Sequence, residues 1–249
     1  MHHEIFTHLF KRLQCRGMLK HFEEVLQTNP FNSDALEGLK RLLELELSYR
    51  EARSFEYRLK LAKLPQIKSL ESFDFSEVPL RLEQLQKLAE CEFIREKTNL
   101  LFIGDSGSGK THLALSLAYA ALTQDYRIKF YTFHELSSHL LKAKMHRYEV
   151  NLIEHLERFQ LLVIDEMGYL PMESQAGSLL FQLFSRLYER TPIILTTHLK
   201  FDEWGSLFGN PKATKAMIDR FTHHCVVLDT GQDSWRLKQA VKKVSASKN

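Results

Sequence analysis

The chain has 249 residues, of which 44% are hydrophobic, 26% charged and 11% aromatic. This composition is typical of a folded globular protein with one large domain or one large and one small domain, and it excludes wholesale disorder. The 10 glycines and 6 prolines exclude collagenous and low-complexity classes, and the net charge of +3 is too small to indicate nucleic-acid binding by itself.

The cysteines and the apolar runs indicate the compartment. Cys15, Cys91 and Cys225 are odd in number and form no CxxC pair, so neither a disulfide framework nor a structural zinc site is predicted. The polar start Met1–Glu4 predicts no signal peptide. The apolar runs are too short to cross a bilayer, which takes about 20 residues. We therefore expect a cytoplasmic protein with no membrane partner.

The first 66 residues follow a helical period, with apolar residues at three- and four-residue spacing. The period is broken at Asn29–Ser33, and Ser33 or Asp34 is expected to cap a long helix that Pro65 ends. We predict a small all-helical N-terminal domain, residues 1–66, that binds DNA or a partner protein.

Residues 67–98 are predicted to be a connector and a lead-in helix. The stretch Lys68–Val78 has no clean period and is expected to lie along the next domain, anchored by Phe73 and Phe75. Pro79 is expected to open the lead-in helix.

From residue 99 onward, short apolar strands alternate with amphipathic helices. This alternation predicts an α/β domain, residues 99–249, in which helices cover both faces of a parallel five-stranded sheet. The expected strands are Asn99–Ile103, Ile128–Phe133, Leu161–Asp165, Pro192–Thr197 and Cys225–Asp229, and the expected helices are Lys110–Leu122, Glu135–Met145, Ser174–Arg190 and Pro211–Phe221.

The strongest motif is a phosphate-binding loop between the first strand and the helix that follows it. Residues 104–111 match G-x-x-x-x-G-K-[ST], whose backbone amides cradle phosphates at a helix N-terminus. Lys110 is expected to reach the outer phosphates and Thr111 to bind Mg²⁺. The predicted ATP-binding residues here are Gly104, Asp105, Ser106, Gly107, Ser108, Gly109, Lys110, Thr111 and His112.

A second motif consists of two acidic residues at the end of the third predicted strand. Asp165 is the expected second Mg²⁺ ligand, and Glu166 is placed to activate an attacking water. With one strand–helix unit between the two motifs, this pattern favours the ATPase division of P-loop proteins.

Three further polar positions are candidates for the site. The fourth strand ends in Thr196-Thr197-His198, where Thr197 and His198 are candidates to touch the water or the γ-phosphate, and Thr196 is equally well explained as a core or capping hydroxyl. Arg220 is a candidate arginine finger for a neighbouring subunit, with a surface salt bridge as the alternative. Arg236 is a candidate to sense nucleotide in its own subunit or to contact DNA.

Basic residues gather in two runs, Tyr49–Lys68 and the last 14 residues. Solvated surface is one interpretation of such runs, and phosphate contact is the other. The histidines show no ligand spacing, and His223-His224 is expected to be structural. The candidate DNA contacts are Arg50, Arg53, Arg58, Lys60, Lys63, Lys212, Lys215, Lys242 and Lys243.

Longer segments resemble a known family across essentially the whole chain. The phosphate loop is shared by many ATPases, whereas Gly-Tyr-Leu-Pro and Trp-Gly-x-x-Phe-Gly-Asn-Pro are more specific. The chain resembles the IstB-like ATPases, helper proteins encoded beside the transposase in a class of bacterial insertion sequences. The segments that resemble the family are Gly104–Ala114, Val163–Pro171, Leu180–Arg190, Phe201–Pro211, Ile218–His224 and the connector Leu70–Phe75.

The resemblance implies an AAA+ core, similar to the replication initiator DnaA and the helicase loader DnaC. It further implies a homo-oligomer that binds duplex DNA with little sequence preference and recruits or stimulates its transposase, with hydrolysis of ATP as the switch. The family commonly has Asn where this chain has His198. One alternative is a DnaC-like helicase loader, which would bind helicase through its N-terminal domain. Another is a monomeric small-molecule kinase. The acid at Glu166 and the absence of an Arg-rich lid disfavour the kinase.

Overall fold

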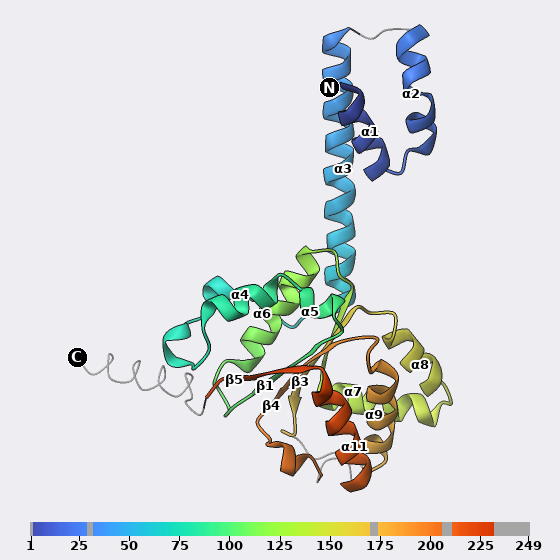
Figure 1. Cartoon of the computed structure of the whole chain (residues 1–249). Helices are drawn as coiled ribbons and strands as arrows, with labels where there is room; N and C mark the ends of the chain where they lie inside the picture. Colours follow the sequence, from blue (N-terminus) through green and yellow to red (C-terminus); the bar gives the residue numbers. More distant parts are fainter. Residues whose placement is uncertain (1, 29–31, 170–173, 206–210, 232–249) are drawn as a thin grey trace, which may run out of the picture. The chain divides into compact units, whose positions relative to one another are not determined.

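The computed structural model describes residues 2–28, 32–169, 174–205 and 211–231 (Figure 1). The chain divides into two compact units, Met1–Tyr57 and Arg58–Asn249. The division falls inside helix α3 (Ser33–Ala62), whereas the sequence placed a domain boundary after that helix, at residue 66. None of the described helices has the length and apolar character needed to span a membrane.

The N-terminal unit is helical, as the period of its sequence indicates. α1 (His2–Arg12) and α2 (Arg16–Thr28) pack together around Phe6, Phe10 and Phe22, whose ring centroids lie 4.8–5.9 Å apart. The cap of α3 differs from the prediction. It is Asn32, whose Oδ1 accepts a hydrogen bond from the Ala35 N–H at 2.8 Å, and not Ser33 or Asp34.

The second unit is an α/β domain built on five parallel strands in the order β2-β3-β4-β1-β5. The strands are β1 (Asn99–Ile103), β2 (Ile128–Thr132), β3 (Leu161–Met167), β4 (Ile193–Thr197) and β5 (Cys225–Asp229). The helices are α4 (Leu82–Ala89), α5 (Glu92–Arg95), α6 (Lys110–Thr123), α7 (Phe133–Met145), α8 (Glu149–Leu156), α9 (Ser174–Leu187) and α11 (Pro211–His223).

Helices lie on both sides of this sheet, with α4 and α6 on one face and α7, α9 and α11 on the other (Figure 1). The three central strands, β1, β3 and β4, are largely apolar and buried, as expected for a parallel sheet covered on both faces. The edge strands β2 and β5 are partly exposed. The five strands were each predicted to within two residues, whereas α8 was not predicted. The core beneath α7 and α9 extends to Trp204 and Phe221, which are both buried.

Candidate functional site

The phosphate loop connects β1 to α6 at the carboxyl edge of the sheet. Gly104, Gly107 and Gly109 have φ values of +149°, +84° and +94°, which side-chain-bearing residues rarely adopt. A Cβ at Gly104 would lie 2.7 Å from the carbonyl oxygen of Gly231, so space as well as backbone conformation requires glycine there. Gly109 caps α6 without any side-chain hydrogen bond to the first turn. The loop and the helix end therefore offer backbone N–H groups to an anion.

Lys110 is the cation of this loop. Its side chain is only 4% exposed, and Nζ donates hydrogen bonds to the carbonyl oxygens of Gly104 and Asp105 at 2.8 Å each. These contacts hold the ammonium group against the loop, where it can exchange carbonyl partners for phosphate oxygens.

The two predicted metal ligands lie side by side. Thr111 Oγ1 donates to Asp165 Oδ1 at 3.0 Å, which joins the start of α6 to β3. Asp165 is buried, and an uncompensated carboxylate there would be costly. A hydroxyl and a carboxylate beside a phosphate loop match the oxygen ligands that Mg²⁺ prefers, so these residues fit the cation that accompanies ATP.

Glu166 lies at an irregularity near the end of β3. The register of β3 against β4 shifts between Ile164 and Met167, and Glu166 has a left-handed backbone with φ +64°. Such a bulge redirects a side chain at a cost in backbone strain, a feature that recurs at functional sites. Asp165 is buried and Glu166 is exposed, as expected for neighbouring residues of a strand, whose side chains alternate between the two faces.

Thr196 is the polar residue of β4 that contacts the two acids. Its Oγ1 donates to Asp165 Oδ1 at 2.5 Å and accepts the Glu166 N–H at 2.9 Å. Thr197 instead donates to the Met167 carbonyl at 2.9 Å. The His198 ring packs edge-on against Tyr169 at 4.3 Å, and its Nδ1 is buried without a partner among the described residues. The sequence offered Thr197 and His198 as candidates and did not single out Thr196.

Lys110, Thr111, Glu166 and Thr196 line an open cavity of about 540 Å³, which lies in the range of small-molecule sites. One wall is the phosphate loop with the start of α6. The other is the connector that precedes α4. Residues from both walls and from β3 and β4 line it: Pro65, Gln66, Lys68, Ser72, Phe73, Asp74, Val78, Ser106, Gly107, Ser108, Gly109, Lys110, Thr111, His112, Leu115, Glu166, Tyr169 and Thr196.

The connector, residues 68–78, lies along the domain as predicted, and His112 contacts it. The Phe73 ring lies 5.1 Å from the His112 ring and directly over Gly109, where a Cβ would be 2.5 Å from the phenyl carbons. His112 Nε2 lies 3.2 Å from both the Ser69 carbonyl oxygen and Ser72 Oγ. Burial lowers the pKa of His112, which favours the neutral ring. His112 therefore contacts the connector and lines the cavity.

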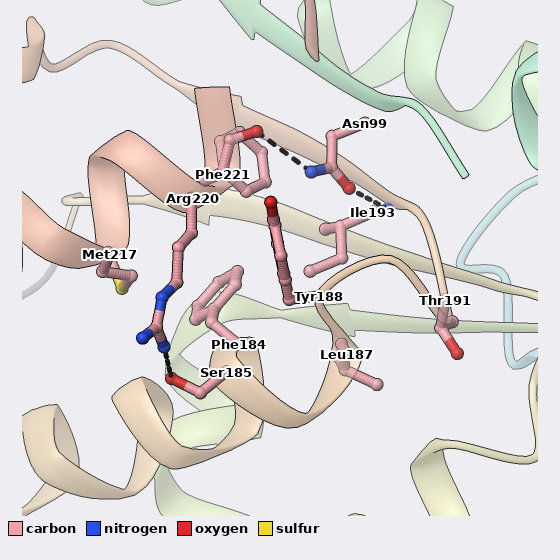
Figure 2. A pocket seen from close by; sticks show the side chains of 10 residues that line it. All are labelled: Asn99, Phe184, Ser185, Leu187, Tyr188, Thr191, Ile193, Met217, Arg220 and Phe221. Atoms are coloured by element: carbon pink, nitrogen blue, oxygen red, sulfur yellow. Dashed lines mark hydrogen bonds between the residues drawn. The ribbon is translucent and has the colours of Figure 1, made fainter. Parts of the chain in front are cut away.

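Arg220 lies far from this cavity, at the opposite edge of the sheet. It lines a small crevice with Asn99, the first residue of β1, whereas the phosphate loop follows the last residue of that strand (Figure 2). Its Nη1 donates to Ser185 Oγ at 3.1 Å, and the side chain is exposed. Arg220 therefore does not contribute to the nucleotide cavity of its own chain.

The candidate DNA-contacting residues include exposed side chains, one buried side chain and residues outside the described part of the chain. Arg50, Arg53, Lys60, Lys63 and Lys215 are exposed. Arg58 is not available as predicted, because it is 8% exposed and forms a salt bridge with Asp125 at 2.5 Å. The side chain of Lys212, and the whole of Arg236, Lys242 and Lys243, lie outside the described residues.

A phosphate loop and an adjacent Asp-Glu strand end on a five-stranded parallel sheet define a P-loop nucleotide-binding protein. The family model described as "IstB-like ATP binding protein" matches residues 8–243. The chain belongs to this IstB-like family.

Relatives with similar sequences are named as ATP-binding proteins of insertion sequences. That of IS5376 from Geobacillus stearothermophilus is 40% identical over 82% of this chain and 81% of its own length. That of IS21 from Pseudomonas aeruginosa is 35% identical over 97% of this chain and 92% of its own length.

Solved structures share the fold at lower identity. DnaA from Aquifex aeolicus bound to AMPPCP has a TM-score of 0.56 at 18% identity, covering 74% of this chain and 56% of that chain. The DnaC helicase loader has a TM-score of 0.53 at 18% identity, covering 65% of this chain and 95% of its own.

Removing the Thr196 hydroxyl should destabilise the strand ends. We expect Thr196→Val to lower the free energy of unfolding by about 1–3 kcal/mol, because the buried Asp165 loses a donor and the Glu166 N–H loses its acceptor. Thr196→Ser keeps the hydroxyl and should cost less. Urea denaturation of both variants measures this, and equal stability of Thr196→Val and wild type would contradict the hydrogen-bonding role.

Proposed function

We propose that this protein hydrolyses ATP with Mg²⁺ and uses the cycle to control its assembly on duplex DNA, where it recruits or stimulates a transposase. The observation that supports the ATPase activity is that Lys110, Thr111 and Glu166 line one cavity, with Asp165 in hydrogen-bond contact with Thr111 directly behind it. The names of its insertion-sequence relatives support the transposition context. Those names also favour a transposase over a helicase as the partner.

The polar residues in and directly behind the cavity each have a proposed part in hydrolysis. The loop amides and Lys110 bind the phosphates, and Thr111 and Asp165 hold Mg²⁺, which supplies neutralisation of phosphate charge. Thr196 keeps Asp165 and the Glu166 backbone in place. Glu166, exposed at the cavity wall, orients a water and accepts its proton during attack on the γ-phosphate.

The test of hydrolysis is the conservative variant Glu166→Gln. We expect ATP affinity near that of wild type and turnover lower by about 10²–10⁴-fold, the usual contribution of a general base. Glu83→Gln changes an exposed residue of α4; it is the matched control and should hydrolyse normally. Radiolabelled phosphate release measures turnover, and a Glu166→Gln protein with wild-type turnover would remove Glu166 from the mechanism.

The position of Arg220, on the surface and away from the nucleotide cavity of its own chain, supports assembly into a multimer. An exposed arginine that lies at the edge of the sheet remote from its own cavity is free to enter the cavity of a neighbouring copy. Contact between subunits would then be a condition of hydrolysis, and DNA would raise turnover by gathering subunits.

Duplex DNA binding is supported by exposed cations, including Lys60, Lys63 and Lys215. A solved DnaA structure is described as bound to AMPPCP and single-stranded DNA. It has a TM-score of 0.55 and is 20% identical to this chain.

DNA affinity is expected to depend steeply on salt and little on sequence, because phosphate contacts release counterions. Lys60→Ala and Lys215→Ala should each lower the slope of log affinity against log salt by about one. Lys87→Ala, which changes an exposed lysine of α4, should leave this slope unchanged. Fluorescence anisotropy with random duplexes measures the slope, and an affinity independent of salt would contradict the electrostatic interpretation.

A further inference from the structure

Three residues of metal-binding types, one glutamate and two histidines, meet at the amino edge of the sheet, away from the nucleotide cavity. Glu189 lies in the turn between α9 and β4, and His223 and His224 join α11 to β5. All three are exposed, and one ligand atom from each lies within 4.8 Å of the others. His224 Nε2 is 3.7 Å from Glu189 Oε1. The sequence alone had indicated a structural role for the histidine pair.

These separations are close to those around a bound dication. Zn²⁺ binds imidazole nitrogen and carboxylate oxygen at about 2.0–2.2 Å, so tetrahedral ligand atoms lie about 3.4 Å apart. To reach this spacing, the ligand atoms of Glu189, His223 and His224 need to move closer to one another by between a few tenths of an ångström and about 1.4 Å. Rotation of these exposed side chains provides such a movement.

The backbone under these side chains is held in place by Asn99. Its Nδ2 donates to the Phe221 carbonyl at 3.0 Å and its Oδ1 accepts the Ile193 N–H at 2.9 Å, as Figure 2 shows. Its backbone N–H donates to the His224 carbonyl at 2.7 Å. One residue thus joins the end of α11 and the starts of β4 and β5. A metal site needs such support from a rigid scaffold.

The side chains are also oriented by neighbours. Glu189 has a left-handed backbone, φ +56°, at the tight turn after α9. The Tyr188 hydroxyl lies 3.3 Å from His223 Nδ1, and the rings of His223 and His224 stand edge to face at 4.3 Å. Hydrogen bonds of this kind to a ligating histidine fix the direction of its ring.

We infer that Glu189, His223 and His224 form a binding site for a transition-metal dication of the Zn²⁺ class, with water at the fourth position. Two imidazole ligands favour Zn²⁺ over Mg²⁺, so this site differs in chemistry from Thr111 and Asp165. Cys225 is not a ligand, because its side chain packs against the core. The bound ion joins the two turns, and it stabilises the folded domain.

The experiment uses Co²⁺ as a spectroscopic probe and Zn²⁺ as its competitor, on the full chain carrying His2→Ala and His3→Ala. That background removes the adjacent histidines near the N-terminus, which bind metal ions independently. We expect one Co²⁺ per chain, with the visible spectrum of a four-coordinate nitrogen–oxygen site and no thiolate charge-transfer band. One equivalent of Zn²⁺ should displace it, and excess Mg²⁺ should not.

Ligand variants decide the assignment. His224→Ala and Glu189→Gln should each weaken Zn²⁺ affinity by about tenfold or more, since even outer-shell partners contribute that much. His134→Ala, an exposed histidine of α7, is the matched control and should bind normally. Zn²⁺ should raise the Tm of the parent and of the control, but not of Glu189→Gln. Thermal unfolding without metal confirms that each variant is folded. Unchanged Zn²⁺ affinity in both ligand variants, a thiolate band, or no binding would overturn the site.

Discussion

Lys110→Ala is expected to abolish measurable ATP binding. The variant removes the buried cation of the phosphate loop together with two charge-assisted hydrogen bonds that its ammonium group can transfer from loop carbonyls to phosphate oxygens. Two such bonds correspond to a loss of affinity of about 100-fold or more. Isothermal titration calorimetry with ATP and Mg²⁺ measures the effect.

Lys87→Ala is the matched control for this experiment, because Lys87 is exposed on α4 and does not line the cavity. It should bind ATP like wild type. An unchanged melting temperature in Lys110→Ala without nucleotide excludes unfolding as the cause. Wild-type ATP affinity in Lys110→Ala would show that residues 104–111 are not the nucleotide site.

Arg220→Ala is expected to lower ATP turnover by about 10³–10⁵-fold while leaving ATP binding nearly intact, the effect seen when other phosphoryl-transfer enzymes lose an arginine finger. The reason is geometric. Arg220 lies beside Asn99 at the start of β1, so the cavity it would serve belongs to another copy of the chain. Turnover at several protein concentrations, with and without DNA, measures the dependence on subunit contact.

A mixing experiment distinguishes this role from a folding defect. Arg220→Ala retains the cavity and lacks the finger, whereas Lys110→Ala retains the finger and lacks a working cavity. Each alone should be inactive, and a mixture should recover partial turnover at interfaces that pair an intact cavity with an intact finger. No recovery, with both variants folded and associated, would leave Arg220 with only its local contact to Ser185.

The arrangement of the site could be predicted wherever a residue's role follows from its position in a motif. Glycine spacing placed the loop before α6, and an apolar run ending in two acids placed Asp165 and Glu166. Strand alternation accounts for the opposite directions of those neighbouring acids. The structure adds a register shift and a left-handed backbone at Glu166, and alternation does not predict this bulge.

Other features of the structure could not be predicted from the sequence, mostly because they depend on contacts with residues distant in the chain. Thr196 is one of three successive polar residues, and its bonds to β3 depend on the pairing of β4 with that bulged strand. Arg58 belongs to a basic run, but its partner Asp125 lies 67 positions away and draws it into the protein. Asn32, one residue before the expected caps, was missed because several capping residue types follow one another there.

Electron microscopy of Glu166→Gln with ATP, Mg²⁺ and random-sequence duplex tests whether the protein assembles on DNA in an ATP-dependent manner. This variant should bind ATP without hydrolysing it, so the assembled state should accumulate as ordered multimers along the DNA. Lys110→Ala under the same conditions should leave the duplex bare or irregularly covered. Ordered multimers formed equally by Lys110→Ala, or none formed by Glu166→Gln that binds ATP, would contradict the account.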